Sequence, residues 1–417
     1  MTSIVNKNKI FNDPIYGFIS LPGEIIFDLI EHPYFQRLRR ISQLGLTYLV
    51  YPGAYHTRFH HALGAMHLMT RAVAILREKG HEITNEEAEA VYIAILLHDV
   101  GHGPFSHALE SAIIPGVSHE WLSIRTMERL NEEMGGRLSL AIRIFKDQYP
   151  KKFLHQLISS QLDMDRLDYL RRDSFYTGVT EGAVNSERLL TMLNVANDNL
   201  VIDAKGIYSV EKFIMARSLM YWQVYLHKTV LSAEFTLVKI LKRAKELARK
   251  GDELFCSRAL HTFLYGEVSA GDFDKDETLL SRFMELDDVD IMSAVKEWCH
   301  HDDLVLRELC QRVVNRRLLK VKLRVKPFEK KVIDEILKKV RDHFQFQNGE
   351  EEYLVIHETE SINTYNPEAD RILLLYKDGT TSNISESAEQ LNIAHLQNNV
   401  TRHFICFPEE LRSPGGI

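Results

Sequence analysis

The sequence predicts a mainly α-helical protein, with a helical core and a smaller C-terminal α+β lobe. Between residues 23 and 320, apolar residues recur at spacings of three and four, which is the spacing of one helix face, and strand-like alternation is rare. After Lys320, alternating stretches surround one amphipathic segment. We therefore expect an N-terminal arm over residues 1–22, a helical domain over 23–320 and the α+β lobe over 321–417.

Local signals support the arm and the helical domain. The arm contains NDPIYG (12–17), in which proline and glycine favour a turn. Three segments of the domain carry apolar residues at helical spacing: HTRFHHALGAMHL (56–68), NEEAEAVYIAILLHD (85–99) and LISSQLDMDRLDYLRRD (157–173). The stretch NLVIDAKGIYSV (199–210) favours a short hairpin that turns at Lys205 and Gly206.

In the C-terminal lobe, strands and helices are predicted to alternate. FEKKVIDEILKKVRDHF (328–344) reads as one amphipathic helix and SAEQLNIAHLQ (387–397) as another. Strands are predicted in LKVKLRV (319–325), EEYLVIHETESI (351–362), RILLLYKDGTTSNIS (371–385) and RHFICF (402–407).

Composition limits the classes of function. The chain has 417 residues, of which 45% are hydrophobic, and a net charge of −7, so a surface that binds nucleic acid broadly is not expected. The basic run RRLLKVKLRVK (316–326) is best explained as a solvated face. Four cysteines form no paired motif: Cys256, Cys299, Cys310 and Cys406. With no signal-peptide core and no membrane-length apolar run, these features favour a cytoplasmic protein without a membrane partner.

A cluster of histidines and aspartates suggests a metal site. His98 follows the apolar helix face of Val91, Ala94 and Ile95, while His61 and Asp165 occupy comparable faces of their own segments. A single buried histidine is most often hydrogen-bonded to a carbonyl, but a divalent metal would compensate all of these polar groups together. Two imidazoles and two carboxylates suit iron, manganese, zinc or magnesium. The four candidate ligands are His61, His98, Asp99 and Asp165.

Further histidines follow His98 closely, in HDVGHGPFSH (98–107) and SHEW (118–121). His102, His107 and His119 are candidates for proton transfer and for holding phosphate oxygens.

Seven blocks of sequence carry a family resemblance. They are NKIFNDPIYG, FQRLRRISQLG, YPGAYHTRFHHALG, LLHDVGHGPFSHALE, SHEW, DMDRLDYLRRD and RSLMYWQVYLHK, and together they span roughly residues 9–230. In them the chain resembles the HD-domain deoxynucleoside-triphosphate triphosphohydrolases, typified by a vertebrate enzyme that also carries a SAM domain. The resemblance implies a helical HD-domain core and the metal ligands named above. It also implies hydrolysis of a dNTP at the α-phosphorus to a deoxynucleoside and inorganic triphosphate.

The resemblance further implies roles for individual residues. His119 matches the histidine that protonates the leaving 5′ oxygen, Glu110 matches the carboxylate that orients it, and His102 faces the phosphate. Glu110 stands where aspartate is common, and Arg166 where lysine is common. Tyr169 would contact the deoxyribose where a 2′-hydroxyl would clash, although a tyrosine there also suits core packing. The expected substrate-binding residues are Gln43, Leu44, Arg58, His107, Arg166, Tyr169, Asp173, Tyr225 and His227.

A guanine-nucleotide effector site is implied in the same way. Its counterparts are Lys9, Ile10, Asn12, Glu31, Gln36, Arg39, Lys228 and Arg307. A second nucleotide pocket matches less well, because Asn194 stands where arginine is expected. We therefore expect a homo-oligomer, a dimer or tetramer, with one purine effector site. The alternative is that these residues only pack between subunits.

Two other functions compete with dNTP hydrolysis. An HD phosphohydrolase that acts on nucleoside monophosphates or signalling nucleotides needs less positive charge than Arg58 and Arg166 would supply. A non-enzymatic nucleic-acid-binding or assembly protein would not need the full set of metal ligands.

Overall fold

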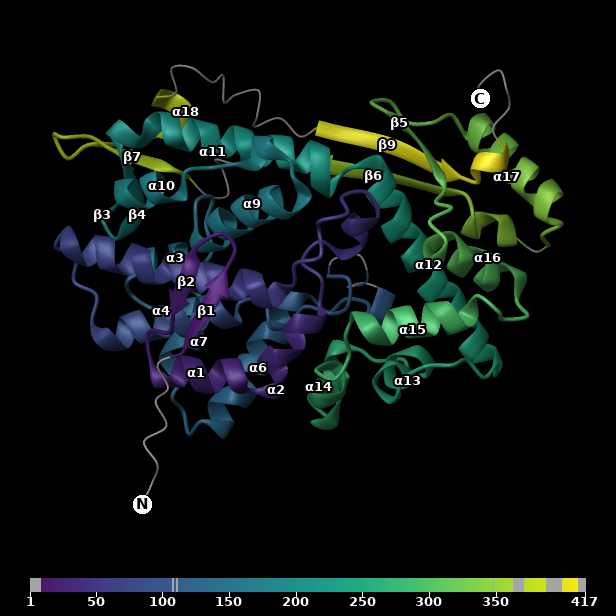
Figure 1. The fold of residues 1–417 in the computed structure, drawn as a ribbon, viewed down its shortest axis with the longest axis horizontal. Helices are drawn as coiled ribbons and strands as arrows, with labels where there is room; N and C mark the ends of the chain where they lie inside the picture. The colour runs from purple at the N-terminus through teal and green to yellow at the C-terminus, as the bar shows by residue number, and fades with distance from the viewer. Residues whose placement is uncertain are drawn as a thin grey trace.

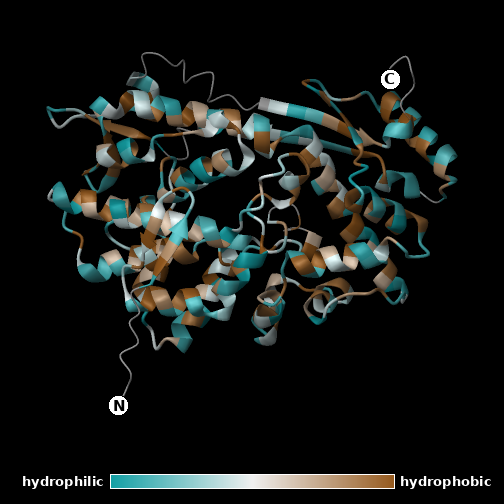
Figure 2. Cartoon of the chain, viewed as in Figure 1, coloured by the Kyte–Doolittle hydropathy of each residue, from teal (hydrophilic) through white to brown (hydrophobic). Residues whose placement is uncertain are grey.

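The computed structural model describes residues 9–106, 109, 112–347, 349–362, 371–387 and 400–411. Figure 1 shows a mainly helical molecule with short strands, as the sequence predicted. Apolar and polar positions alternate around the helices in Figure 2, as expected for helices that each bury one face. None of the described helices is long and apolar enough to cross a membrane.

Three helices form the centre of the N-terminal half: α3 (Arg58–Glu78), α4 (Asn85–Leu97) and α9 (Met164–Thr177). Helix α3 packs against both of the others. The approach of α9 depends on Gly64, because a Cβ there would lie 2.0 Å from Asp168 Oδ1. Thr84 and Glu87 form a capping box that starts α4. Helices around this centre are α1 (Glu24–Glu31), α2 (Pro33–Gln36), α6 (His119–Glu133), α7 (Ser139–Phe145) and α8 (Lys152–Gln156).

The described part of the N-terminal arm is a hairpin of β1 (Ile10–Asp13) and β2 (Gly17–Ser20). The predicted turn at NDPIYG is confirmed. The Asp13 carboxylate accepts hydrogen bonds from the backbone N–H groups of Ile15 and Tyr16, which stabilises the turn.

The second predicted hairpin begins earlier in the chain than expected: NLVID (199–203) is its second strand and not its first. It pairs β3 (Leu193–Ala196) with β4 (Asn199–Asp203), and the chain turns at Asn197 and Asp198, both with positive φ. The prediction of a turn at Lys205 and Gly206 is wrong: these residues lie in a 3₁₀ turn that leads into α11 (Ile207–Met220). Asparagine and aspartate tolerate the left-handed region better than most residues, so the Asn-Asp pair takes the turn.

The second half of the chain is built around the long helix α12 (Lys228–Lys250). It packs against α13 (Arg258–Tyr265) and α16 (Leu304–Val314). The remaining elements before the lobe are α10 (Ser186–Met192), a π-helical turn (Tyr221–Tyr225), α14 (Thr278–Phe283) and α15 (Asp288–Trp298).

Strands of the C-terminal segment enter two different sheets. β5 (Lys320–Arg324), β9 (Val400–Phe407) and β6 (Ile356–Ile362) form one antiparallel sheet near α17 (Lys330–Phe344). β7 (Leu373–Leu375) and β8 (Thr381–Asn383) instead extend the β3–β4 hairpin, with β7 parallel to β4. Most of the helix predicted over 387–397 lies outside the described residues.

Candidate functional site

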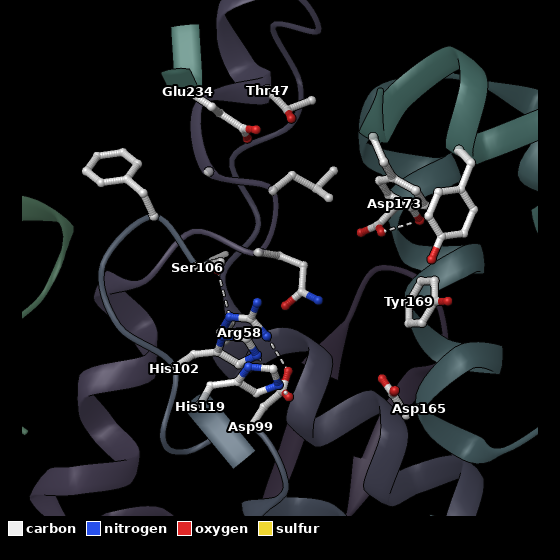
Figure 3. Close-up of a pocket in the computed structure, with 16 residues that line it drawn as sticks. Thr47, Arg58, Asp99, His102, Ser106, His119, Asp165, Tyr169, Asp173 and Glu234 are labelled. Atoms are coloured by element: carbon white, nitrogen blue, oxygen red, sulfur yellow. Dashed lines mark hydrogen bonds and ion pairs between the residues drawn. The ribbon is translucent and has the colours of Figure 1, made fainter. Parts of the chain in front are cut away.

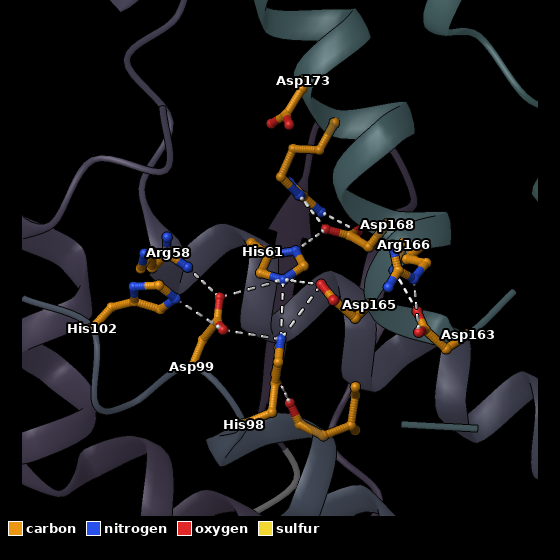
Figure 4. Close-up of polar contacts among 12 residues, drawn as sticks. Arg58, His61, His98, Asp99, His102, Asp163, Asp165, Arg166, Asp168 and Asp173 are labelled. Carbon is orange, nitrogen blue, oxygen red and sulfur yellow. Dashed lines mark hydrogen bonds and ion pairs between the residues drawn. The ribbon is translucent and has the colours of Figure 1, made fainter. Parts of the chain in front are cut away.

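Two buried histidines face each other at the centre of the helical core. His61 lies in the first turn of α3 and His98 directly follows α4; their exposed fractions are 0% and 9%. Their Nε2 atoms are 3.4 Å apart (Figure 4). The sequence-based expectation that both point into the core is therefore confirmed.

Asp99 and Asp165 complete this cluster. An Asp165 oxygen lies 3.0 Å from His61 Nε2 and 3.5 Å from His98 Nε2. Asp99 oxygens lie 3.8 Å from His61 Nε2 and 3.4 Å from His98 Nε2. The four residues that sequence reasoning selected as ligands thus meet around one point. We call them the His/Asp cluster.

The outer nitrogens of both histidines are already engaged. His61 Nδ1 lies 2.8 Å from Asp168 Oδ2, and His98 Nδ1 lies 2.6 Å from the Ile95 carbonyl oxygen. Because both partners can only accept, each Nδ1 carries the proton, and a neutral ring then directs the lone pair of its Nε2 into the cluster. Two lone pairs and two carboxylates converge there. These lone pairs and carboxylate oxygens repel one another unless a proton or a cation lies between them. Histidines that bind metals likewise donate their outer N–H group to a hydrogen-bond acceptor.

The electrostatics of the cluster favour positive charge. Burial opposes the charged imidazolium of His61, but hydrogen bonds with Asp165 and Asp168 outweigh this and raise its pKa to about 10. Burial also opposes the charged form of Asp165, yet hydrogen bonds from His61 and His98 hold its pKa well below the ordinary value. A divalent cation can replace the protons that these residues otherwise share, so the donor set fits a divalent metal.

Asp165 reaches the cluster by a different local structure from the one predicted. The segment 157–173 is not one helix, because α9 begins only at Met164 and the predicted face of Ile158 and Leu162 precedes it. Asp163 caps the helix by accepting the backbone N–H of Arg166 at 2.7 Å. This cap places Asp165 in the first turn of α9, beside the cluster.

A cavity of about 350 Å³ opens beside the cluster, within the usual size of small-ligand sites. Asp99 and Asp165 line one end of it (Figure 3). Eight further residues predicted for catalysis or substrate binding also line it: Gln43, Leu44, Arg58, His102, His119, Tyr169, Asp173 and Tyr225.

His102 and His119 stand together next to Asp99. Their rings stack with centroids 3.8 Å apart, and His102 Nε2 lies 3.4 Å from an Asp99 oxygen. Burial and the nearby Arg58 charge hold the pKa of His102 well below its ordinary value, so this ring is neutral. The predicted partners Glu110 and His107 lie outside the described residues.

Arg58 is buried between the cluster and the cavity. Its Nη1 pairs with Asp99 and its Nε donates to Ser106 Oγ at 2.8 Å. Arg58 thus forms a buried ion pair, and the same side chain also lines the cavity.

A second group of side chains, on the opposite wall, surrounds Asp173. One of its oxygens lies 2.7 Å from His56 Nε2, and the other accepts the Tyr225 hydroxyl at 2.7 Å. His56 itself stacks on Tyr176 with ring centroids 4.4 Å apart. Tyr169 lines the cavity one helical turn before Asp173. This carboxylate is thus held in a fixed orientation at the cavity wall.

Two predicted substrate residues do not line this cavity. Arg166 turns back along α9, and its Nε donates to the Ser160 carbonyl at 2.6 Å and pairs with Asp163. His227 caps α12 by accepting the backbone N–H of Thr229. Both side chains are occupied by the start of the helix on which they lie.

The residues predicted for an effector site do not form one site within a single chain; they lie in three places. Around β1 and α1, Lys9 pairs with Glu31 at 2.7 Å, and Arg39 donates to Gln36 at 2.8 Å. Ile10 and Asn12 are exposed nearby on β1. Arg307 lies on α16, where its Nη1 donates to the His301 carbonyl. Lys228 lines a separate cavity at the start of α12.

That separate cavity is basic. Besides Lys228 it is lined by Arg312, Arg316, Arg317 and Lys320. Two carboxylates also line it: Glu410 pairs with Arg312, and Glu409 pairs with Lys320. The sequence had suggested only a solvated face for the run 316–326.

Sequence reasoning missed several residues of the main site. Asp168 was detectable, because it lies three residues after Asp165 and shares its helix side. Glu234 was detectable by the signal used for Asp165, since it interrupts an apolar face of Leu231 and Leu237. Nothing in the local pattern marked His56. Five other lining residues were not predicted: Gly45, Thr47, Phe105, Ser106 and Tyr221.

Comparison with known proteins identifies the helical core. Residues 58–173 match the HD domain family and residues 184–254 match the HD associated region. The match to the HD domain includes all four residues of the His/Asp cluster.

Three relatives illustrate the range of similarity. A crystal structure of a phosphohydrolase from Bacteroides thetaiotaomicron is 52% identical, covers 96% of this chain and 99% of its own, and superposes with a TM-score of 0.93. The Bacillus subtilis protein YwfO is 36% identical, over 75% of this chain and 72% of its own length. The Dictyostelium discoideum homolog of the deoxynucleoside triphosphate triphosphohydrolase SAMHD1 is 32% identical, over 60% of this chain and 52% of its own.

The matched HD domain, the geometry of its histidines and aspartates, and the extent of these similarities lead to one conclusion. The chain belongs to the HD-domain phosphohydrolase family.

Proposed function

We propose that this phosphohydrolase cleaves deoxynucleoside triphosphates to a deoxynucleoside and inorganic triphosphate. The observation that carries the proposal is the composition of one cavity. The His/Asp cluster and Arg58 stand at one end, and a tyrosine–aspartate group suited to a sugar stands on a nearby wall. The similarity to the SAMHD1 homolog, named as a deoxynucleoside triphosphate triphosphohydrolase, supports the same substrate class.

The phosphate end of the site uses the cluster and its neighbours. His61, His98, Asp99 and Asp165 would hold a divalent cation, which when bound supplies a more acidic water and a Lewis acid for a phosphate oxygen. Arg58 contributes positive charge to the cavity wall, where it meets the anionic substrate. His119 donates a proton to the leaving 5′ oxygen, and the stacked ring of His102 holds it in place.

The sugar end selects a deoxyribose. Asp173, fixed by His56 and Tyr225, accepts a hydrogen bond from the 3′-hydroxyl, with Gln43 on the neighbouring wall. The Tyr169 ring lies against the sugar and leaves no space for a 2′-hydroxyl. Deoxynucleotides are therefore preferred over ribonucleotides.

Product analysis tests the proposal. The protein is incubated with each dNTP and each NTP in the presence of Mn²⁺ or Mg²⁺, and the phosphate products are separated. We expect inorganic triphosphate from dNTPs and little turnover of NTPs. Release of orthophosphate or pyrophosphate alone would contradict the proposal.

A second candidate is an HD phosphohydrolase for a nucleotide with fewer phosphates. The pairing of Arg58 with Asp99 and of Arg166 with Asp163 favours it, because these guanidinium groups then have less charge to offer a triphosphate. Orthophosphate release from a nucleoside monophosphate in the same assay would support this candidate.

We also propose an anionic effector at the basic cavity beside Lys228, supported by its four arginine and lysine neighbours. The assay is repeated with GTP or dGTP added, and light scattering follows the oligomeric state, predicted as dimer or tetramer. No stimulation of dNTP hydrolysis by guanine nucleotides would remove the effector.

A further inference from the structure

One acidic side chain lines the cavity without a part in the chemistry proposed above. Glu234 lies on α12, the first helix of the second half of the chain. Figure 3 shows Glu234 and Thr47 at one end of the cavity, and Asp99, His102 and His119 at the other. The cavity thus has one end beside the His/Asp cluster and Arg58, where the proposed function puts the phosphates, and a distal end that carries a carboxyl group.

The Glu234 carboxyl lacks a hydrogen-bond partner of its own. Among the residues that the structure describes, none forms a hydrogen bond or an ion pair with it. Burial, together with the nearby Glu360 carboxyl, raises the pKa of Glu234 to about 8. The Glu234 side chain is half-buried in the cavity wall, so a ligand that fills the cavity buries it further and must supply the missing hydrogen-bond partner.

The backbone around Glu234 leaves room for such a ligand. Gly45 faces the carboxyl in a left-handed conformation, and a Cβ there would lie 3.2 Å from Glu234 Oε1 and 3.4 Å from the Phe105 carbonyl oxygen. A larger residue at this position would fill the distal end. Leu44 and Phe105 add apolar surface to the same wall.

We propose that Glu234 hydrogen-bonds the edge of the substrate's nucleobase and thereby sets the preference of the enzyme among bases. The inference rests on the proposed function, since it requires the phosphates to lie at the His/Asp cluster. The distribution of cationic groups supports that direction, because Arg58 is the one arginine or lysine among the described lining residues and it stands beside the His/Asp cluster. The other end of a nucleotide is a neutral, flat base with an apolar face and a polar edge.

The chemistry of a carboxyl group suits a base edge in either protonation state. A neutral carboxyl offers one donor beside one acceptor, and an ionised carboxylate accepts from two N–H groups. Each natural base carries at least one N–H on its edge, whereas a phosphate or a sugar ring oxygen does not. Thr47 lies beside Glu234 and offers a hydroxyl to the same edge.

The test separates the base from the rest of the substrate. We measure kcat/KM for the four dNTPs with wild-type protein and with Glu234→Leu, which removes the hydrogen-bonding group but keeps a good helix former. In parallel, 2-deoxyribose 5-triphosphate, which lacks a base, is measured as a competitive inhibitor. We expect kcat/KM to fall about tenfold for at least one dNTP and unequally among the four. The inhibition constant of the base-free compound should stay within about twofold.

Two variants control for structural effects. Glu234→Gln keeps a donor and an acceptor, so it should recover most of the lost activity and alter the order of base preference. Glu253→Gln changes an exposed carboxyl shortly after the end of α12, which does not line the cavity, and should leave the order unchanged.

The outcomes distinguish this inference from the proposed function. If wild-type protein releases no triphosphate from any dNTP, the proposed function fails. If it does so, but Glu234→Leu leaves all four kcat/KM values unchanged, the inference alone fails. It also fails if the base-free inhibitor weakens as much as the dNTPs do, because Glu234 then acts on the whole cavity.

Discussion

The two ends of the cavity beside the His/Asp cluster differ in how many contacts the protein itself makes to their polar groups. At the His/Asp cluster, each histidine is fixed through its outer nitrogen, and Asp99 also pairs with Arg58. At the distal end, Glu234 has no such partner among the described residues, and a glycine keeps the space open. The difference teaches that the cluster end is fixed by the protein's own contacts, which is the preorganisation that the proposed catalysis requires. The distal end leaves its polar group for the ligand.

The largest expected effect comes from breaking the cluster end. Asp165→Ala should lower activity by more than about 10³-fold, beyond the 10–100-fold typical of losing an outer contact, and should release the metal. The fold should persist, because the Asp165 side chain is 29% exposed and does not cap its helix. Metal content by elemental analysis, turnover and a circular-dichroism melt check this. The exposed Asp274→Ala serves as control, and full activity of Asp165→Ala would refute the ligand assignment.

The second largest effect should come from Asp168, whose carboxylate accepts the hydrogen bond from His61 Nδ1. Asp168→Asn keeps the shape of the side chain but removes the charge that His61 Nδ1 faces, so metal affinity should fall about 10–100-fold. Isothermal titration of the metal-free protein with Mn²⁺ measures this. Asp168 also binds the buried Arg172, so stability should fall as well.

Asp13→Asn is the matched control for that change. Asp13 also pairs with Arg172, at 2.9 Å, but it does not contact His61. The control should lose stability and keep metal affinity. Equal loss of affinity in both variants would mean that Arg172, and not the imidazole contact, maintains the cluster.

Lower pH should gradually weaken metal binding at the His/Asp cluster. The hydrogen bonds to Asp165 and Asp168 raise the pKa of His61 to about 10, so below that pH a proton competes with the metal for this residue. Lowering the pH should therefore reduce metal affinity, by up to about tenfold per unit for each displaced proton, and raising it should strengthen binding. Titrations between pH 6 and 8 test the sign, and a pH-independent affinity would contradict it.

A smaller effect is expected at the cavity wall that carries Asp173, where the proposed function puts the sugar. His56→Phe removes the nitrogen that holds Asp173 while keeping a ring to stack on Tyr176. KM for dNTPs should rise about threefold to tenfold, with kcat less affected, since one hydrogen bond of this kind contributes about 1 kcal/mol. Steady-state kinetics measure the split between kcat and KM. His60→Phe changes a neighbouring histidine that bonds to Thr57 instead, and should have little effect.

The smallest effect is expected at Arg307, which does not line the cavity. Its Nη1 donates to the His301 carbonyl, so Arg307→Ala should change dNTP turnover and its response to GTP by less than about twofold. A large loss of GTP response in this variant would instead place the effector at Arg307, outside the basic cavity.

The sequence predicted those features that follow from helix periodicity. His61 and His98 could be predicted to point inward because their helices are regular, and the pattern of histidines and aspartates predicts all four cluster residues. Contacts that depend on where a helix begins were not predictable in the same way. Asp163 ends one segment and starts another, which turns Arg166 away from the cavity. His56 and Gly45 act through the tertiary approach of distant segments, for which the local pattern holds no signal.

The pairing of β7 with β4 carries a consequence for how the chain is made. Val201 lies opposite Leu373, so the parallel pair joins positions that emerge from the ribosome far apart in time. Until the later strand is synthesised, β4 presents an open backbone edge to other nascent chains. Chains truncated near residue 320 lack β7 and should keep the edge of β4 exposed. We expect these chains to aggregate through that edge, so their yield of monodisperse protein should be lower than that of the full chain.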